Sequence, residues 1–140
     1  MSLDIFLADD AATICFGEDM ALALRRGDYV ALHGDLGAGK STFARAVIRA
    51  IADDALLEVP SPTFTLVQSY DLRIPVAHFD LYRIADAAEI DELGFDEALS
   101  DGICLVEWPE KGFGALPADG ITLRFVHEGD GRRIGIDGPA

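Results

Sequence analysis

The stretch that decides the fold is Gly34-Asp35-Leu36-Gly37-Ala38-Gly39-Lys40-Ser41, which matches the spacing G-x-x-x-x-G-K-[ST] at every constrained position. A short apolar run, 28–33, precedes it as a predicted buried strand, and apolar residues recur at helical spacing from Ser41 to about Ala52. Strand, glycine loop and helix form the arrangement in which backbone N–H groups surround a phosphate. We therefore predict a nucleotide-binding loop, in which Lys40 reaches the outer phosphates and Ser41 ligates Mg²⁺.

A simpler interpretation of the motif is a glycine-rich turn that carries a lysine by chance. Composition weakens it, because Lys40 is one of only two lysines in the chain, the other being Lys111. The strand before the motif and the helix after it weaken it further, since accidental matches seldom have that context. We favour nucleotide binding.

Length and charge narrow the class of protein. The 140 residues predict one domain, residues 1–140, and half of them are hydrophobic, so the chain can bury a core without disulfides. The net charge of −14 argues against broad direct contact with nucleic acid or an anionic membrane. It fits a protein that docks on a basic partner, or one that is simply soluble.

The remaining composition points to the cytoplasm. Residues 1–10 contain no basic region and therefore do not form a signal peptide, and no apolar run approaches membrane-spanning length. Cys15 and Cys104 form no C-x-x-C pair, and we expect both to be buried thiols in a reducing cytosol.

The N-terminal segment predicts a strand over 3–7 and a helix that Asp9 or Asp10 caps and that reaches roughly residue 25. Gly17 in mid-helix is unfavourable, so it marks a close approach by another element. Packing of the helix on a strand is the simpler explanation. The alternative is a nucleotide base that lies against Asp10, Thr13 and Gly17.

The rest of the chain supplies more strands than helices. A hairpin is predicted over 65–70 and 75–79, a helix over 86–93 that begins with a capping box, a further helical turn or two over 95–99, a strand over 103–106 and a closing hairpin over 121–126 and 133–136. The fold class is therefore α/β, a single P-loop NTPase-like domain. Its central sheet is mixed and mostly parallel, flanked by helices, with antiparallel hairpins.

Two carboxylates follow predicted strands, Asp80 after Phe79 and Glu107 after Val106. Ligands collect at the carboxyl ends of parallel strands, and P-loop proteins need a carboxylate there to hold Mg²⁺ and a group that orients the attacking water. Glu107 best fits the metal side, and Asp80 could share that duty or polarise water. The alternative for either is a solvent-exposed strand end.

Other side chains leave two interpretations open. Thr63, on a loop stiffened by Pro60 and Pro62, fits a switch residue that senses the γ-phosphate or a turn threonine with a satisfied hydroxyl. His78 fits packing better than catalysis. Either hairpin arginine, Arg132 or Arg133, could reach a nucleotide, but a solvated hairpin tip is the simpler expectation. The chain has no asparagine and no T-K-x-D, so ATP is favoured over GTP by elimination.

Five segments together resemble one family. They are 34–42 (GDLGAGKST), 61–64 (SPTF), 78–83 (HFDLYR), 92–94 (ELG) and 106–110 (VEWPE), and in this order they are similar to the bacterial TsaE (formerly YjeE) ATPases. The similarity extends from about Thr13 to Glu110 and is weak after Gly112. Where the family often has Thr, this chain has Ser41, which keeps the hydroxyl.

The resemblance implies an ATPase required for threonylcarbamoyl modification of adenosine-37 in tRNAs that read ANN codons. It implies that the protein acts together with the TsaD–TsaB pair. We expect it to contact tRNA only indirectly and not to bind a membrane. Lys40, Asp80 and Glu107 would be catalytic, and Ser41 and Glu107 would ligate Mg²⁺. ATP would contact the loop residues Gly37, Ala38, Gly39, Lys40, Ser41 and Thr42, Thr63 would belong to a switch-like loop, and Trp108 would lie near the site. To these predicted ATP contacts we add Asp10 and Thr13, from the alternative in which the base lies against the first helix.

Two rival functions remain from the sequence. A small-molecule P-loop kinase needs an acceptor pocket and a lid, for which no segment is spare. A nucleotide-switched binding module would use ATP only to order the 61–64 loop. Because arginines near the site are few, we also expect slow turnover until a partner completes the site.

Overall fold

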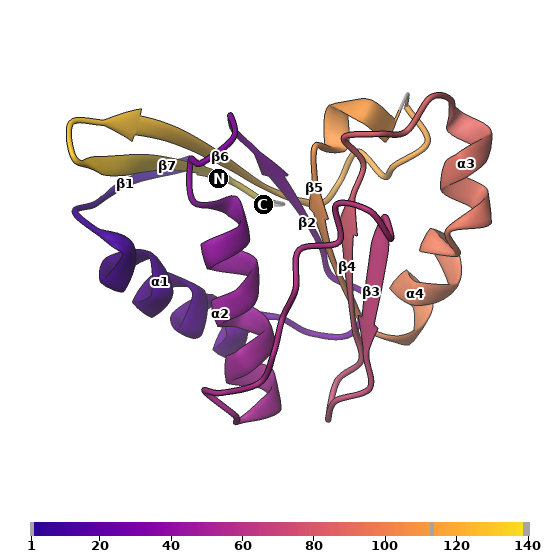
Figure 1. Ribbon diagram of the computed structural model, residues 1–140, viewed down its shortest axis with the longest axis horizontal. Helices are drawn as coiled ribbons and strands as arrows, with labels where there is room; N and C mark the ends of the chain where they lie inside the picture. The colour runs from indigo at the N-terminus through magenta and orange to yellow at the C-terminus, as the bar shows by residue number, and fades with distance from the viewer. Residues whose placement is uncertain (1, 113, 139–140) are drawn as a thin grey trace.

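The computed structural model describes residues 2–112 and 114–138. Its sheet has seven strands in the order β1-β7-β6-β2-β5-β4-β3 (Figure 1). Their bounds are β1 Ser2–Leu7, β2 Tyr29–His33, β3 Val67–Tyr70, β4 Val76–Asp80, β5 Ile103–Glu107, β6 Ile121–Glu128 and β7 Gly131–Asp137. The neighbours β6, β2, β5 and β4 run parallel, whereas β3, β7 and β1 join antiparallel. The predicted fold class, with a parallel centre and antiparallel additions, is confirmed.

Helices cover the sheet on both sides. The helices are α1 Asp10–Ala23, α2 Lys40–Ala52, α3 Ala87–Glu92 and α4 Phe95–Asp101, with a short 3₁₀ turn, η1, at Pro109–Gly112. Figure 1 shows α1 and α2 side by side, away from α3 and α4. Alternate side chains of β2 point to opposite faces of the sheet. Val30 and Leu32 pack with α1 and α2, whereas Tyr29 and Ala31 pack with α3 and α4.

Gly17 is where α1 meets α2. A Cβ at this position would lie 2.7 Å from the Cβ of Ala46 and 3.0 Å from the carbonyl oxygen of Phe43. The predicted close approach is confirmed, but the partner is a helix and not a strand. The absence of a side chain lets the two helix backbones approach each other directly.

The element boundaries agree with the sequence within two residues, and the small differences have local causes. Asp9, not Asp10, caps α1, since its carboxylate accepts from the Ala12 N–H at 2.9 Å. β3 begins at Val67 and not at residue 65, because a turn closes from the Leu66 N–H to the Pro62 carbonyl at 2.8 Å.

Cys15 is exposed on α1, so the expectation that both thiols are buried is wrong for it, whereas Cys104 is buried.

No helix within residues 2–112 and 114–138 is both long enough and apolar enough to span a membrane.

Candidate nucleotide-binding site

A pocket of about 330 Å³ opens where the loop after β2 meets the carboxyl ends of β4 and β5. Segments far apart in the chain line it: the start of α1, the glycine loop, the start of α2, the loop before β3, and one residue of β7. The lining residues are Asp10, Leu36, Gly37, Gly39, Lys40, Ser41, Thr42, Ser61, Thr63, Asp80, Glu107, Trp108 and Arg132. The strand ends therefore meet the glycine loop where the sequence predicts.

Two glycines give the loop its shape. Gly34 has φ 148°, and a Cβ there would come within 2.8 Å of the Phe125 carbonyl oxygen on β6. Gly39 has φ 108° and precedes the first residue of α2, in a left-handed conformation that other residues rarely adopt. A Cβ at Gly39 would overlap the guanidinium of Arg132. The first turn of α2 thus directs its N–H groups and its positive dipole end at the pocket.

Lys40 is almost completely buried, with 4% of its surface exposed. Its ammonium donates to the Gly34 carbonyl and lies 3.7 Å from the centre of the Trp108 ring. Burial lowers the pKa of Lys40, and the nearby carboxylates of Glu107 and Glu110 oppose that shift. A desolvated cation at this place is suited to an anionic ligand.

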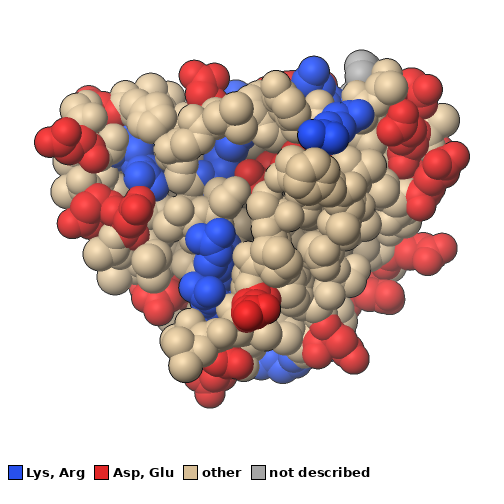
Figure 2. All heavy atoms as spheres, viewed as in Figure 1, with Lys and Arg blue, Asp and Glu red and all other residues tan. Residues whose placement is uncertain are grey.

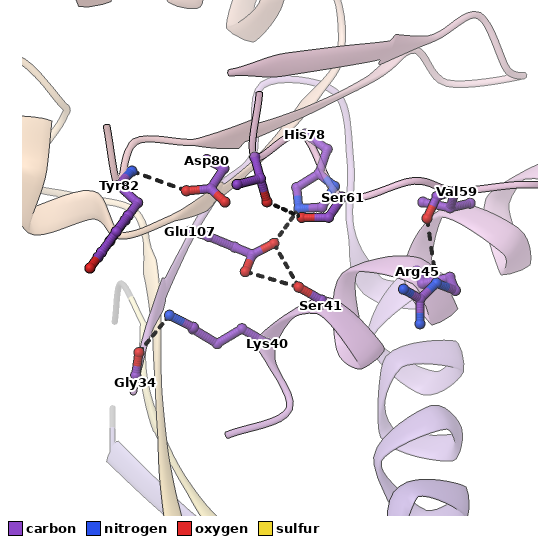
Figure 3. Close-up of polar contacts among 11 residues, drawn as sticks. Gly34, Lys40, Ser41, Arg45, Val59, Ser61, His78, Asp80, Tyr82 and Glu107 are labelled. Carbon is purple, nitrogen blue, oxygen red and sulfur yellow. Dashed lines mark hydrogen bonds and ion pairs between the residues drawn. The ribbon is translucent and has the colours of Figure 1, made fainter. Parts of the chain in front are cut away.

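Ser41 and Glu107 contact each other directly (Figure 3). The Ser41 hydroxyl lies 3.1 Å and 3.3 Å from the two oxygens of the Glu107 carboxylate. The imidazole Nε2 of His78 lies 2.7 Å from Oε2 of the same carboxylate. Glu107 is 4% exposed and His78 1%, so the contact between them is buried, whereas the contacts of Ser41 with Glu107 are partly buried at the pocket.

The alternation of β4 and β5 explains this gathering. Asp80 lies opposite Glu107 in the parallel register, and His78 is two residues before Asp80. Side chains two residues apart share a face of a strand, and this face is the one that α2 covers. Figure 3 shows that His78, Asp80 and Glu107 lie on the side of the sheet that faces Ser41 and Lys40.

Asp80 is 6% exposed and accepts a hydrogen bond from the Tyr82 N–H at 3.0 Å. Burial raises the pKa of the Asp80 carboxyl, as does the neighbouring Glu107, whereas the hydrogen bond from Tyr82 lowers it. The two strand-end carboxylates are buried in one pocket and are not solvent-exposed ends.

Arg132 is the residue that the sequence placed wrongly. Its side chain is 11% exposed, lines the pocket and lies over Gly39, so it is not at a solvated hairpin tip. Its Nη2 donates to the Asp10 carboxylate at 2.8 Å, while Nε and Nη1 are buried without a partner among the described residues. Arg133 is the solvated residue, 45% exposed and paired with Glu128 at 2.9 Å.

Comparison with known proteins adds the family. A family model described as threonylcarbamoyl adenosine biosynthesis protein TsaE matches residues 7–134. The chain belongs to the TsaE family. This family acts in the biosynthesis of tRNA threonylcarbamoyladenosine.

Individual relatives agree. The chain is 39% identical over 140 residues to the tRNA threonylcarbamoyladenosine biosynthesis protein TsaE of Haemophilus influenzae, with 95% of this chain and 87% of the relative covered. It is 38% identical over 109 residues to the Bacillus subtilis protein of that name, with 76% of this chain and 66% of the relative covered. The crystal structure of YdiB from Bacillus subtilis superimposes with a TM-score of 0.79 at 27% identity, covering 97% and 84% of the two chains.

Among the residues that the sequence analysis predicts for nucleotide binding, two lie away from the pocket surface. Thr13 is completely buried, and its hydroxyl donates to the Asp9 carbonyl at 3.4 Å. Ala38 is packed in the core, and its N–H donates to the Asp35 carbonyl at 3.1 Å. Thr63 does line the pocket, with its hydroxyl 2.8 Å from that of Ser61.

Further aromatic side chains are next to pocket-lining residues, Tyr82 against Trp108 and Phe64 directly after Thr63. The rings of Tyr82 and Trp108 are 4.9 Å apart, and Phe64, 81% exposed, lies 4.8 Å from the guanidinium carbon of Arg83. Figure 2 shows red carboxylates around much of the visible face and blue side chains gathered toward its middle and upper edge. The few cations of this acidic chain are therefore not evenly distributed.

Proposed function

We propose that the protein binds Mg-ATP in this pocket and hydrolyses it, as an accessory to the TsaD–TsaB pair in the formation of the threonylcarbamoyl group on adenosine-37 of tRNAs that read ANN codons. The observation that carries the proposal is the convergence of the buried Lys40 ammonium, the Ser41 hydroxyl and the Glu107 carboxylate at the N-terminus of α2.

The residues fit a triphosphate. Arg132 offers two buried nitrogens that have no partner among the described residues, and such donors are rarely left unpaired in a folded protein. Lys40 offers a desolvated ammonium, and the first turn of α2 offers backbone N–H groups. An anionic ligand would satisfy all three at once. The absence of asparagine and of T-K-x-D favours adenine over guanine.

The residues also fit a magnesium ion that the nucleotide helps to hold. Within the described residues, no cluster of three or more His, Cys, Asp or Glu side chains could hold a metal alone. Mg²⁺ commonly binds through one or two protein oxygens together with substrate phosphates, and Ser41 and Glu107 would supply those oxygens. When bound, the ion neutralises charge on the phosphates.

Each side chain then has a role in hydrolysis. Lys40 binds the outer phosphates and stabilises the charge that the leaving oxygens carry. Asp80 orients the attacking water and accepts its proton at a carboxylate oxygen, a task for which a raised pKa is an advantage. Thr63 belongs to a loop that responds to the γ-phosphate.

The proposed dependence of turnover on a partner is supported by the exposed side chains at the edge of the pocket, which we call the rim. Leu36, Phe64 and Tyr82 are large apolar side chains that are 73%, 81% and 47% exposed. Leu36 lines the pocket, Phe64 follows the lining residue Thr63, and Tyr82 packs on the lining residue Trp108. Arg132 is the single arginine among the described lining residues, and Asp10 already binds it. A partner that covers the rim would exclude water from the pocket and complete the charge around the phosphates.

Two measurements and one variant test the proposal. Calorimetry with Mg-ATP is expected to show one binding site per chain, and no heat from a folded sample would refute nucleotide binding. Phosphate release is expected to be slow for the protein alone and faster with TsaD–TsaB, whereas equal rates would refute partner activation. Glu107→Gln should bind ATP but not turn it over. If that variant still supported tRNA modification, the protein would be a nucleotide-switched binding module.

A further inference from the structure

We propose that His78 is a positioning residue, which holds the Glu107 carboxylate by an Nε2–H hydrogen bond so that this carboxylate faces Ser41 and the magnesium it would share. This inference rests on the proposed function and adds a residue to which only packing was assigned.

The contact is built into the sheet. His78 lies on β4 opposite Leu105 of β5, two residues before the Asp80–Glu107 pair, so it is below Glu107 on the same face. Its Nε2 is 2.7 Å from Glu107 Oε2, and its side chain is buried in the layer between the sheet and α2. Because both residues are on paired strands, this geometry is more rigid than a contact between loops.

The chemistry of the two groups assigns the proton. A carboxylate oxygen at hydrogen-bond distance requires a donor on Nε2, since two lone pairs facing each other would repel. The other nitrogen, Nδ1, is buried and has no partner among the described residues. The tautomer with hydrogen on Nε2 leaves only an acceptor unpaired at Nδ1, whereas the reverse arrangement would leave a buried N–H unpaired and would require a protonated Glu107.

The consequence is a separation of charges at the site. Glu107 and Lys40 line the same pocket, so an ion pair between the two would compete for both groups. Instead Glu107 accepts from Ser41 and His78, while Lys40 donates to the Gly34 carbonyl. His78 thus keeps the carboxylate on the metal side and leaves the ammonium for phosphate.

The test compares two amide variants of similar size. In His78→Gln the amide nitrogen can replace Nε2, whereas in His78→Asn it falls near Nδ1 and does not reach Glu107. Nucleotide affinity is measured for ADP and ATP by calorimetry, once with EDTA and once with Mg²⁺, after melting curves show that each variant is folded. Tyr70→Phe is the matched control, because it removes another buried polar group without a described partner, away from the pocket.

We expect all four proteins to bind nucleotide equally in EDTA. The gain in affinity on adding Mg²⁺ should persist in His78→Gln and Tyr70→Phe and should fall about 10- to 100-fold in His78→Asn, the usual range for residues that orient a metal ligand. An unchanged gain in His78→Asn, or an equal loss in both amide variants, would overturn the inference while leaving the proposed function intact. A wild-type protein that binds no nucleotide would overturn the proposed function itself.

A measurement on the wild-type protein covers the case in which a variant does not fold. Nitrogen-15 spectra of the histidine rings, with His78 assigned, should show hydrogen on Nε2 both with and without Mg-ADP. Hydrogen on Nδ1 alone would overturn the inference.

Discussion

The ten residues of β4 and β5 are divided between two faces of the sheet, and the two faces differ in function. Toward α2 the strands present three core residues, Val76, Ile103 and Leu105, and three polar residues. Of the polar residues, Asp80 and Glu107 line the pocket, and His78 contacts Glu107. Toward α3 and α4 they present Ala77, Phe79, Cys104 and Val106, which are all buried in an apolar cluster. Period-two alternation thus makes one face entirely apolar, while the other face combines core residues with the polar side chains of the site.

The apolar face is closed by ring contacts and burial. The Phe95 ring of α4 lies 5.4 Å from both Tyr29 and Phe79, and burial raises the pKa of the Cys104 thiol to about 12. The face toward α2 contains the buried carboxylates of Asp80 and Glu107. Only neighbouring side chains and a bound ligand would compensate these charges. Substitutions on the first face should therefore change stability, and substitutions of the polar residues on the second should change binding.

Lys40→Ala should give the largest effect on binding and little effect on folding. The ammonium contributes to phosphate affinity but is buried at a cost in the free protein. We expect calorimetric heat with Mg-ATP to disappear and the melting temperature to be unchanged or higher.

Lys111→Ala is the control for that substitution, because it removes the other lysine, which lies over the Tyr82 ring outside the pocket lining. Full ATP affinity in Lys40→Ala would contradict the site assignment.

Phe79→Ala tests the opposite face. Removing a ring that is 1% exposed should lower the free energy of unfolding by about 3–5 kcal/mol, measured by urea denaturation. Below the unfolding transition the variant should bind ATP as the wild type does. Phe64→Ala, at an exposed ring, should change stability by no more than about 0.5 kcal/mol. A Phe79→Ala protein that is stable but binds no ATP would show that the two faces are not independent.

Gly17→Ala tests the layer that supports the face toward α2. The added methyl meets the Ala46 Cβ and a backbone carbonyl, and that overpacking exceeds the gain in helix propensity. We expect a net loss of about 1 kcal/mol in a thermal melt. Adding Ala46→Gly should recover part of the loss through a favourable coupling, and purely additive effects would contradict the proposed contact.

Asp80→Asn should abolish turnover through the loss of the proposed proton acceptor, but its effect on stability should be the smallest of the series and should depend on pH. Because burial raises the folded-state pKa of Asp80, its protonated form is favoured in the folded protein. The wild type therefore loses stability as pH rises through this pKa, and the stability is fully present below the unfolded-state value. At neutral pH the asparagine variant should melt slightly higher than the wild type, and the difference should shrink as pH falls toward 4, close to an ordinary Asp pKa. A difference that is constant with pH would contradict the shift.

The sequence predicted the glycine loop and both strand-end carboxylates because each is a local pattern, a spacing or an apolar run followed by an acid. It did not predict the contact between His78 and Glu107, because that contact depends on which strands are neighbours and in which register. Arg132 was misplaced for the same reason. Its hairpin is visible in the sequence, but the position of β7 beside β1, with Arg132 over Gly39 of the loop after β2, is not.

The neighbours of β2 also determine when the site can form. This central strand pairs with β5 and β6, which begin at Ile103 and Ile121, whereas β2 ends at His33. A ribosome releases the glycine loop early, yet the strand that leads into it has no hydrogen-bonding partner until most of the chain has been made. Such distant pairing slows folding, so from residue 41 until at least residue 103 the nascent protein carries a complete phosphate-binding motif whose strand has no neighbouring strand to pair with.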